Sequence, residues 1–524
     1  MLCATRNDCF FPVLFIFFLN GIFHFSGFAQ NWQLINPTYS TSETIVAGFS
    51  VADYGATGDG ITDVTAIFQA RLNALGTSGG GTLWVPSGKY VIAGNLTIPK
   101  GVTLRGDWRK PVKGQPINGT ILMAYAGRGD TSAAAFITQQ PESGVEDIAI
   151  WYPDQLPNNI TPYPPSILFG QSGYFGNDFC NARDITLVNS YLGVTYSLLN
   201  GGTCPVMIGI YGTPLSTGCM IDNIVDVGRI ENVDFSPAYW EGSGLPNSPA
   251  PGSYVERWIK QNGTGILMRR NDWTYTSYVS VDGYNIGFRA APSIASPGAI
   301  PNGHNYGMTF TNCNYGVYFD GVSNVGIMFA RVNMVNCTNG IYIGPGASVT
   351  NGAAQFHTCT IDASSNAIVT DSTSAPRLML EHCTITRGKV NIGGGTFMPS
   401  DCDFNNTAPQ ITLQSNSRGI ITGNRFKTTA NIQNNSPFQC AIDNTPLTLK
   451  AMPTFPIIVT ETHAPTRLVL YNAAAAPYNA KNDNSTDNTN VIQSALNQAS
   501  SDGGGIVFLP PGKYRVKRKS YYTF

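Results

Sequence analysis

The spacing of apolar residues changes from helical to strand-like at two places along the 524-residue chain. At the first place, Phe68, Leu72 and Leu75 lie three or four positions apart, which predicts an amphipathic helix. Three glycines at 79–81 interrupt this pattern, and the apolar run at 82–85 then predicts a short strand. The local order is therefore helix, glycine turn and strand.

The same order recurs near the end of the chain. Residues 54–90 align without a gap on residues 478–514, and 16 of the 37 aligned pairs are identical. Many of the other pairs are conservative, such as Trp84 with Phe508. A match at a constant offset indicates two copies of one structural unit.

Short apolar segments also recur between the two copies. Residues 145–150, 182–187 and 230–235 share one template of a small or apolar residue, a polar pair and alternating apolar positions. The separation of the second and third segments corresponds to two coils of a solenoid. Irregular stretches at 153–179 and 237–270 predict insertions on one face of these coils.

A column of cysteines gives the clearest period. Intervals of roughly 20–25 positions, which are typical of a solenoid repeat, separate Cys313, Cys337, Cys359, Cys383 and Cys402. One period further on, Asn424 takes the place of the cysteine. One small side chain per period predicts a β-solenoid in which free thiols stack inside the coils. Paired C-x-x-C spacing is missing from the sequence, so a cysteine metal site receives little weight.

Composition agrees with a β-rich protein. Glycine contributes 56 residues, charged residues make up only 12%, and the formal net charge is −1. No basic patch stands out in the sequence, so we expect no nucleic-acid partner. The predicted fold class is all-β.

The N-terminal segment 1–29 resembles an export signal. Arg6 precedes an apolar run at 9–22, and small residues before Gln30 place cleavage near Ala29. The run is shorter than the ~20 residues of a spanning helix, so we expect no membrane association in the mature form. The predicted location is outside the cell, in the periplasm or at the cell surface. Cys204 and Cys219 could then form a disulfide, and the sequence leaves this open.

The repeated unit carries a family resemblance. Its motif comprises residues 53–56, 58–60, Thr62-Asp63, Gln69, the three glycines and Pro86-x-Gly88-Lys89-Tyr90. It resembles the N-terminal unit of pectate-lyase-superfamily (pectin-lyase-like) proteins. This resemblance implies a right-handed parallel β-helix with a short N-terminal capping helix. It covers only the two short segments directly.

Two such units in tandem resemble the glycoside hydrolase family 55 glucanases, in which two β-helices lie side by side. The predicted organisation is a signal peptide at 1–29, a β-helix at 46–450, a linker at 451–477 and the start of a second β-helix at 478–524. The second unit would therefore be truncated. In that family much of the catalytic acid comes from the second helix, so no family catalytic residue is transferred to this chain.

The region 235–284 is the strongest candidate for a site. It concentrates tryptophans, which stack on sugar rings, among acids that could act as acid and base in glycoside cleavage. The predicted catalytic residues are Glu241, Glu256 and Asp272. The predicted substrate-binding residues are Trp240, Trp258, Trp273, Arg269 and Arg270. In an equally weighted alternative, the aromatic residues anchor a long loop and the acids pair with arginines.

Other groups of polar residues give weaker indications. The histidine and acid motifs of polygalacturonases are missing from the sequence, and four histidines in the mature chain make a zinc site unexpected. Asp222 and Asp226 near Arg229 could serve a calcium-dependent lyase, although an ordinary coil position is a simpler explanation. We therefore expect no metal ion and no cofactor, with Ca²⁺ required only under the lyase alternative.

These observations predict an exported protein whose partner is a polysaccharide. The leading hypothesis is a glycoside hydrolase that cleaves β-glucan or pectin-type polymers by carboxylate acid/base chemistry. One alternative is a lyase that acts by β-elimination on polymers of uronic acids. Another is a solenoid that binds glycans without catalysis.

Overall fold

The computed structural model describes residues 32–39, 41, 43–170, 178–196, 201–347, 352–443, 445–446 and 467–517. The predicted signal peptide, and with it the predicted cleavage near Ala29, lies outside these residues, as does most of the predicted linker. Within the described part of the chain, no helix is long and apolar enough to cross a membrane.

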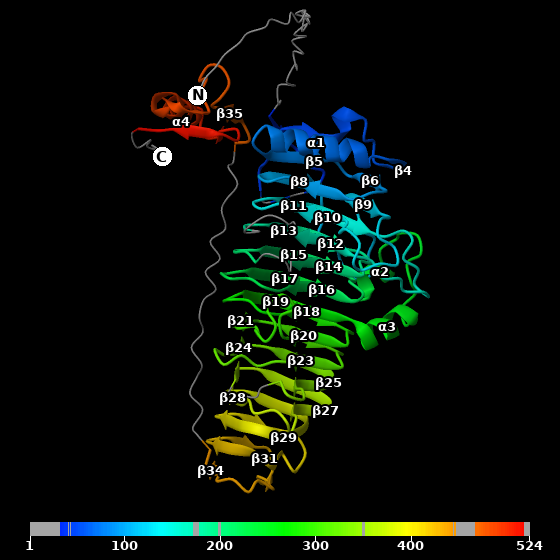
Figure 1. Ribbon diagram of the computed structural model, residues 1–524, viewed down its shortest axis with the longest axis vertical. Coiled ribbons are helices and arrows are strands. Elements are labelled where there is room, and N and C mark those ends of the chain that lie inside the picture. The colour runs from blue at the N-terminus through cyan, green and yellow to red at the C-terminus, as the bar shows by residue number, and fades with distance from the viewer. Residues whose placement is uncertain are drawn as a thin grey trace, which may run out of the picture. The chain divides into compact units, whose positions relative to one another are not determined.

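Parallel strands stacked coil upon coil form the main body of the protein (Figure 1). Pairing along the chain produces three ladders, and every pairing in them is parallel. The only antiparallel strand pair in the described residues joins β1 (Gln33–Ile35) to β2 (Ile45–Ala47). The predicted all-β class with stacked coils is confirmed, whereas the right-handed turn of the coil stays a prediction.

The first ladder contains β3 (Phe49–Ser50), β5 (Gly81–Val85), β8 (Val102–Gly106), β11 (Gly144–Trp151), β13 (Asn181–Leu187), β15 (Val206–Gly212), β17 (Arg229–Phe235), β19 (Tyr275–Asp282), β21 (Gly303–Tyr306), β24 (Ile327–Ala330), β26 (Ala353–His357), β28 (Arg377–Glu381), the last part of β29 (Thr384–Ser400), β31 (Ile411–Thr422) and β34 (Ala441–Asp443). Val145, Ala182 and Ile230 occupy equivalent positions in it, with Met207 between the last two. The predicted two-coil spacing is therefore correct.

The second ladder contains β4 (Asp59–Asp63), β6 (Gly88–Ile92), β9 (Thr120–Ala124), the far ends of β11, β13, β15, β17 and β19, then β22 (Thr309–Thr311), the first parts of β25 (Asn333–Ile343), β27 (Thr360–Thr370) and β29, and finally β30 (Asp403–Phe404) and β32 (Arg425–Phe426). The third contains β7 (Leu96–Ile98), β10 (Ile137–Gln139), β12 (Pro165–Phe169), β14 (Leu192–Tyr196), β16 (Thr217–Ile221), β18 (Thr264–Met268), β20 (Ile286–Ala290), β23 (Tyr315–Phe319), the far ends of β25 and β27, the middle of β29, the start of β31 and β33 (Ile432–Asn434).

The cysteine column lies at one corner of the coils. All five of its cysteines are buried and free, as the period predicted. Four of the thiols donate to a backbone carbonyl of an earlier coil, as Cys383 does to Phe356 O over 3.3 Å. Asn424 continues the column by accepting from Cys402 N over 2.9 Å. The nine described cysteines are all free, Cys204 and Cys219 included.

A sharp turn precedes each member of this column. The residue before each cysteine has a left-handed backbone conformation, with φ between 51° and 54°. Asparagine, aspartate and histidine enter this region more readily than most residues with a side chain. These turn residues are Asn312, Asn336, Thr358, His382 and Asp401. The turn moves the following thiol into the core, and the side chains of Asn312 and Asn336 remain exposed.

The two copies of the repeated unit have matching structures. Helix α1 (Thr65–Thr77) and helix α4 (Thr489–Ser501) begin and end at equivalent positions. Asp59 accepts from Thr62 N and Oγ1, and Asp483 does the same from Thr486. β36 (Asp483–Asp487) pairs with β38 (Lys513–Arg515) as β4 pairs with β6.

Helix α1 buries Phe68, Leu72 and Leu75 and contacts β5, β7 and β8, so the predicted helical pattern marks its packed face. The shorter helix η1 (Val51–Tyr54) precedes it. In the second copy, β35 (Leu470–Asn472) pairs with β37 (Ile506–Phe508), although it lies within the predicted linker.

The predicted insertions are shorter than the sequence suggested. Residues 153–179 include β12, and 237–270 include β18, both of which belong to the third ladder. These two strands are short apolar segments within mostly polar stretches, so the sequence pattern did not indicate that they belong to the coils. What remains of the second insertion is two helices, α2 (Ala238–Glu241) and α3 (Tyr254–Asn262).

Candidate functional site

A cavity of about 380 Å³ lies where helices α2 and α3 meet the coils. It is lined by Ser236, Pro237, Ala238, Glu241, Glu256, Arg257, Lys260, Asp282, Gly283 and Asn312. The helices supply two carboxylates and two cations, while Asp282 ends β19 and Asn312 comes from the turn before Cys313. Two of the three predicted catalytic acids, Glu241 and Glu256, therefore face the same cavity.

These two carboxyl groups contact each other. Burial is the main cause that raises the pKa of Glu241 to about 7, and a hydrogen bond with Glu256 and the charge of that group raise it further. The Oε1 atom of Glu241 is buried and has no hydrogen-bond partner among the described residues. Near neutral pH, the pair therefore holds a proton that Glu241 can donate.

The loop that leads into α3 holds Glu256. Gly252 N donates to Glu256 Oε1 over 2.6 Å, and Arg257 Nη1 donates to the carbonyl of Gly252 over 3.0 Å. Gly252 has a φ of 75°, which an ordinary side chain would strain, so glycine suits this anchoring loop. A carboxylate that accepts a backbone N–H is stabilised in its charged form. This contact holds the Glu256 carboxylate at the entrance to α3, beside Glu241.

The opposite wall connects the helices to the cysteine column. The ammonium group of Lys260 donates to the backbone carbonyl of Asn312, and Asn312 Nδ2 donates to Asp282 Oδ1 over 3.0 Å. None of these three residues is among the catalytic or substrate-binding residues predicted from the sequence. The position of Asn312 directly before Cys313 could have indicated that its side chain lies at a turn on the surface.

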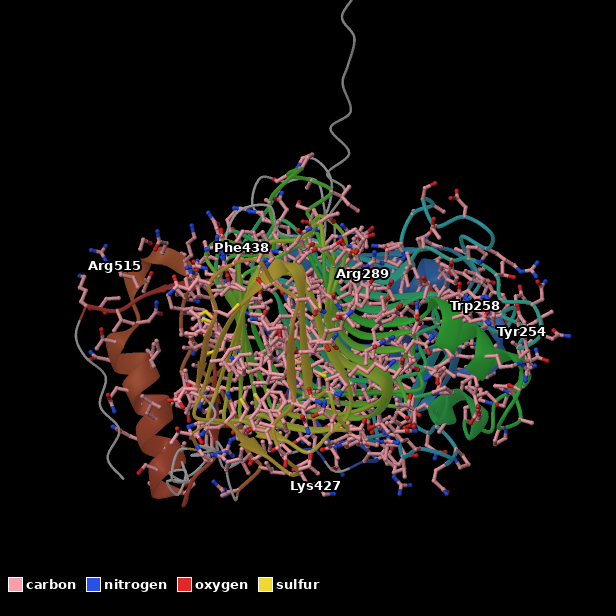
Figure 2. All side chains as sticks on the ribbon, turned by 90° about the horizontal axis from the view of Figure 1, so that it is seen from below. Tyr254, Trp258, Arg289, Lys427, Phe438 and Arg515 are labelled. Atoms are coloured by element: carbon pink, nitrogen blue, oxygen red, sulfur yellow. The ribbon has the colours of Figure 1, made fainter. Side chains whose placement is uncertain are left out.

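The predicted aromatic residues separate into three environments. Trp240 is fully buried in the core, which corrects its assignment to a substrate-binding surface. Trp258 is partly buried on α3, with its ring centroid 6.0 Å from that of Tyr191. Trp273 is 45% exposed and lies 5.4 Å from the ring of His304. Figure 2 labels Trp258 with its exposed neighbour Tyr254 at the side of the coils.

Asp272, Arg269 and Arg270 do not line the cavity. Arg270 Nη2 lies 3.1 Å from Asp272 Oδ2, and Arg270 Nη1 donates to Asn223 Oδ1 over 2.9 Å. Arg269 donates to the carbonyl of Pro292. The alternative in which acids pair with arginines therefore describes Asp272, whereas the cavity contains the other two acids.

Comparison with known proteins supports the resemblance seen in the sequence. A family model described as rhamnogalacturonase A/epimerase, pectate lyase-like, matches residues 48–139 and 474–523. These matches cover both copies of the repeated unit, so the chain is pectate-lyase-like in these segments.

Two curated proteins from Azotobacter vinelandii share part of the chain. Mannuronan C5-epimerase AlgE1 is 40% identical over 91 residues, which are 15% of this chain and 6% of the epimerase. Alginate lyase 7 is 34% identical over 83 residues, which are 16% of this chain and 8% of the lyase. The chain thus matches only a small part of the length of these relatives.

Among solved structures, the A-module of mannuronan C-5 epimerase AlgE4 from Azotobacter vinelandii is similar with a TM-score of 0.39 and 14% identity. The similarity covers 75% of this chain and 98% of the module. At this level no site residue can be transferred.

Proposed function

We propose that the protein is a polysaccharide-active enzyme whose catalytic acid and base are Glu241 and Glu256. The observation that carries this proposal is the Glu241 pKa of about 7 inside a cavity that a second carboxyl group also faces. General acids work best when their pKa lies near the working pH. Glu241 would donate its proton to the leaving oxygen, and Glu256 would act as the carboxylate partner.

The approach of the two carboxyl groups constrains this mechanism. They share a hydrogen bond, whereas the carboxyl groups of glycosidases lie roughly 5–10 Å apart. A bound sugar must therefore separate the two carboxyl groups. We expect the side chain of Glu256 to rotate away, because it lies in the first turn of α3 and its backbone partner is the loop residue Gly252. We assign the proton-donating role to Glu241 because burial raises the pKa of its carboxyl group to about 7.

Two of the predicted substrate contacts remain part of the proposal. Trp258 lies on the same helix as Glu256, and Trp273 presents an exposed ring beside His304. Exposed aromatic faces can stack on the apolar faces of sugar rings. Asp272, Arg269 and Arg270 are excluded because their side chains bind elsewhere.

A lyase reaction by β-elimination on uronic acid polymers is the second candidate. Arg257 and Lys260 line the same cavity and could neutralise a uronate carboxylate. The named activities of the two Azotobacter relatives, an epimerase and an alginate lyase, are consistent with such substrates. In this reaction Glu256 would remove the proton next to the carboxylate, and Glu241 would protonate the departing oxygen.

Product analysis distinguishes the two candidates. The full chain is incubated separately with a β-glucan, a pectin and an alginate, and reducing ends and ultraviolet absorbance are followed. New reducing ends without absorbance identify a hydrolase, and unsaturated absorbing ends identify a lyase. Unchanged turnover by Glu241→Gln would refute the site in either case. Retention on a glycan without any product would favour the non-catalytic alternative.

We further propose that the protein acts outside the cytoplasm, after removal of residues 1–29. We also propose a tandem arrangement that resembles glycoside hydrolase family 55 glucanases, with right-handed coils and a capping helix. The matching hydrogen bonds of Asp59 and Asp483 in the two copies of the unit support this tandem arrangement.

A further inference from the structure

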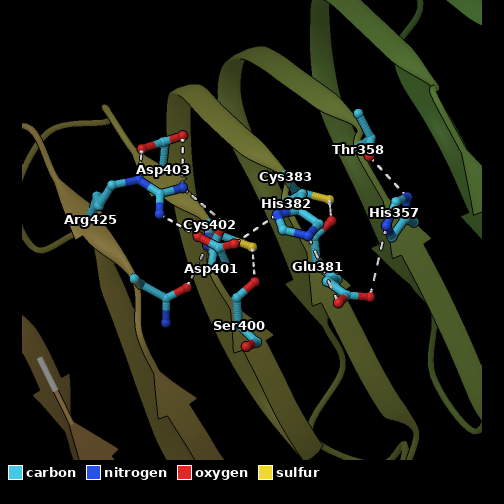
Figure 3. A network of polar contacts seen from close by, with 11 residues as sticks. His357, Thr358, Glu381, His382, Cys383, Ser400, Asp401, Cys402, Asp403 and Arg425 are labelled. Carbon is cyan, nitrogen blue, oxygen red and sulfur yellow. Dashed lines mark hydrogen bonds and ion pairs between the residues drawn. The ribbon is translucent and has the colours of Figure 1, made fainter. Parts of the chain in front are cut away.

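Two histidines and a glutamate converge on the coils far along the chain from Glu241 (Figure 3). His357 ends β26 and Glu381 ends β28, and these two residues are direct register partners on neighbouring strands. His382 follows at the left-handed turn, with a φ of 51°. One ligand atom from each of the three side chains lies within 4.8 Å of the others.

The distances fit a shared ion better than direct contacts. His357 Nε2 lies 3.9 Å from Glu381 Oε2, and His382 Nε2 lies 3.9 Å from Glu381 Oε1. Hydrogen bonds between nitrogen and oxygen are about 2.7–3.2 Å long, so these pairs are too far apart to bond directly. Ligand atoms around a tetrahedral zinc ion are about 3.4 Å apart, given zinc–ligand bonds of about 2.1 Å. Each histidine–glutamate distance would have to shorten by about 0.5 Å to reach that spacing.

The second nitrogen of each ring is already engaged. His382 Nδ1 lies 2.8 Å from Asp401 Oδ2, and His357 Nδ1 lies 2.9 Å from Thr358 Oγ1. Asp401 is itself held by an ion pair with Arg425. A carboxylate on the far nitrogen fixes the ring and its tautomer and increases the basicity of the nitrogen that faces a metal. Both Nε2 atoms are thereby left for a ligand.

A cavity of about 430 Å³ opens beside these residues. His357 and Glu381 line it, together with Gln355, Ser400, Thr422 and several apolar side chains. The side chain of Glu381 is 61% exposed and that of His382 is 23% exposed. An ion held here would thus keep coordination positions open toward the cavity, as catalytic zinc sites do.

We propose that His357, Glu381 and His382 form a binding site for a divalent transition metal of the zinc type. Imidazole nitrogens select zinc and its neighbours over calcium or magnesium, which prefer oxygen ligands alone. His357 Nε2, His382 Nε2 and the Glu381 carboxylate are the ligands, and Asp401 is a positioning residue. The site is independent of the Glu241–Glu256 pair.

The sequence carries an indication of this site in the positions of its histidines and acids relative to the cysteine column. His357 and His382 both occur within two positions of a cysteine of the column, as do Glu381 and Asp401. Residues at the same place in successive coils become neighbours in space. Four histidines are enough for a metal site here because the coils bring two of them together beside Glu381.

Titration of the chelator-treated full chain with Zn²⁺ tests the proposal. Calorimetry gives the dissociation constant, and elemental analysis after desalting gives the number of ions per chain. Co²⁺ serves as a second probe because its visible absorption reports the coordination geometry. We expect one tightly bound ion per chain.

Four variants make the test specific. His357→Ala and His382→Asn should each weaken Zn²⁺ binding at least 100-fold, and Asn suits the left-handed turn at 382. Asp401→Asn should weaken binding by about 10–100-fold while the Co²⁺ spectrum keeps its shape. His304→Ala, which removes a histidine that packs on Trp273, should leave binding unchanged.

Circular dichroism confirms that each variant is folded. If His357→Ala and His382→Asn bind Zn²⁺ as the parent does, the proposal is overturned. It is also overturned if His304→Ala weakens binding as much as they do, because the ion is then held nonspecifically by exposed histidines. Glu381→Gln keeps the size of an exposed side chain, and a folded Gln variant with parental affinity would remove glutamate from the ligand set.

Discussion

Arg105 on β8 donates to Asp147 on β11 over 2.7 Å, although 42 positions separate the two residues in the chain. Arg105 also lies 2.9 Å from Glu43 and 3.4 Å from Glu146. Burial raises the pKa of Asp147 to about 6, against the opposing charge of Arg105. This arginine therefore neutralises several carboxylates that the stacked coils bring together.

Replacing Arg105 by methionine is expected to destabilise the fold by about 3–5 kcal/mol at pH 8, because a buried carboxylate would lose its partner. The loss should be smaller at pH 5, where Asp147 can become neutral. Urea denaturation at both pH values measures this difference. Arg229→Met is the matched control, because its pair with Glu231 is partly exposed and should be worth less than about 1 kcal/mol. Equal losses in the two variants would contradict the expectation.

Asp184 belongs to the same cluster of charges, but its ionised carboxylate lowers the stability of the fold. Burial raises its pKa to about 6 in the folded protein, well above the value of an unfolded aspartate. The folded state therefore holds a proton more tightly, and its stability falls as the pH rises from about 4 to 6. Asp184→Asn removes this loss and keeps a residue that tolerates the φ of 53°.

The Asp184→Asn variant should consequently melt at a higher temperature than the parent at pH 7, by an amount equivalent to roughly 1–2 kcal/mol. At pH 4 the two proteins should melt alike. Thermal denaturation followed by circular dichroism at both pH values is the measurement. A variant that is less stable by the same amount at both values would show that Asp184 stabilises the fold through hydrogen bonds instead.

Glu241→Gln is expected to reduce turnover of the polysaccharide substrate by about 10²–10⁴-fold, because a general acid is lost. In the parent, activity should decline as the pH rises through about 7, since Glu241 then loses its proton. Initial rates across pH 5 to 9 check both statements. Glu142→Gln changes a half-exposed glutamate paired with Lys100 and should keep full activity. A parent rate that increases through pH 7 would contradict the role of Glu241 as the acid.

Aromatic stacking inside the coils should be important for stability. Phe329 lies 4.9 Å from Phe356 with nearly parallel rings and 5.1 Å from Phe288 with perpendicular rings. Phe329→Ala would leave a cavity where these three rings meet, and the free energy of unfolding should fall by about 3–5 kcal/mol. Denaturant unfolding measures the change. Phe438→Ala is the control, because this ring is 42% exposed against Arg418 and should matter little.

The repeating parts of this fold could be predicted from the sequence because a solenoid places equal positions above one another. The intervals between Cys313 and Cys402 gave the coil length, and the buried free thiols followed from it. The repeated unit gave both helices for the same reason. Local spacing determines these features, so no long-range knowledge was needed.

The site could be predicted only in part. Glu241 and Glu256 were chosen by residue type, but their contact depends on how two short helices pack on the coils. Trp240 is of a residue type that often binds sugars, but it is buried in the core. The spacing of residues along the chain does not distinguish a surface tryptophan from a core tryptophan. Asp282 and Asn312 join the cavity through strand register and a turn; the cysteine after Asn312 marks the turn, but neither residue has neighbours in the chain that place it beside Glu241.

The accessibility of the thiols provides a final test of the column. Seven described cysteines are buried, whereas Cys204 and Cys440 are half-buried. Burial also raises the pKa of Cys180 to about 12, so little of the reactive thiolate forms there. A thiol reagent should therefore modify Cys204 and Cys440 in the native protein and the other seven only in denaturant. Mass spectrometry of peptides assigns each label, and a reducing agent should leave the melting temperature unchanged. Rapid native labelling of Cys359 or Cys383 would show that the coils open at this corner.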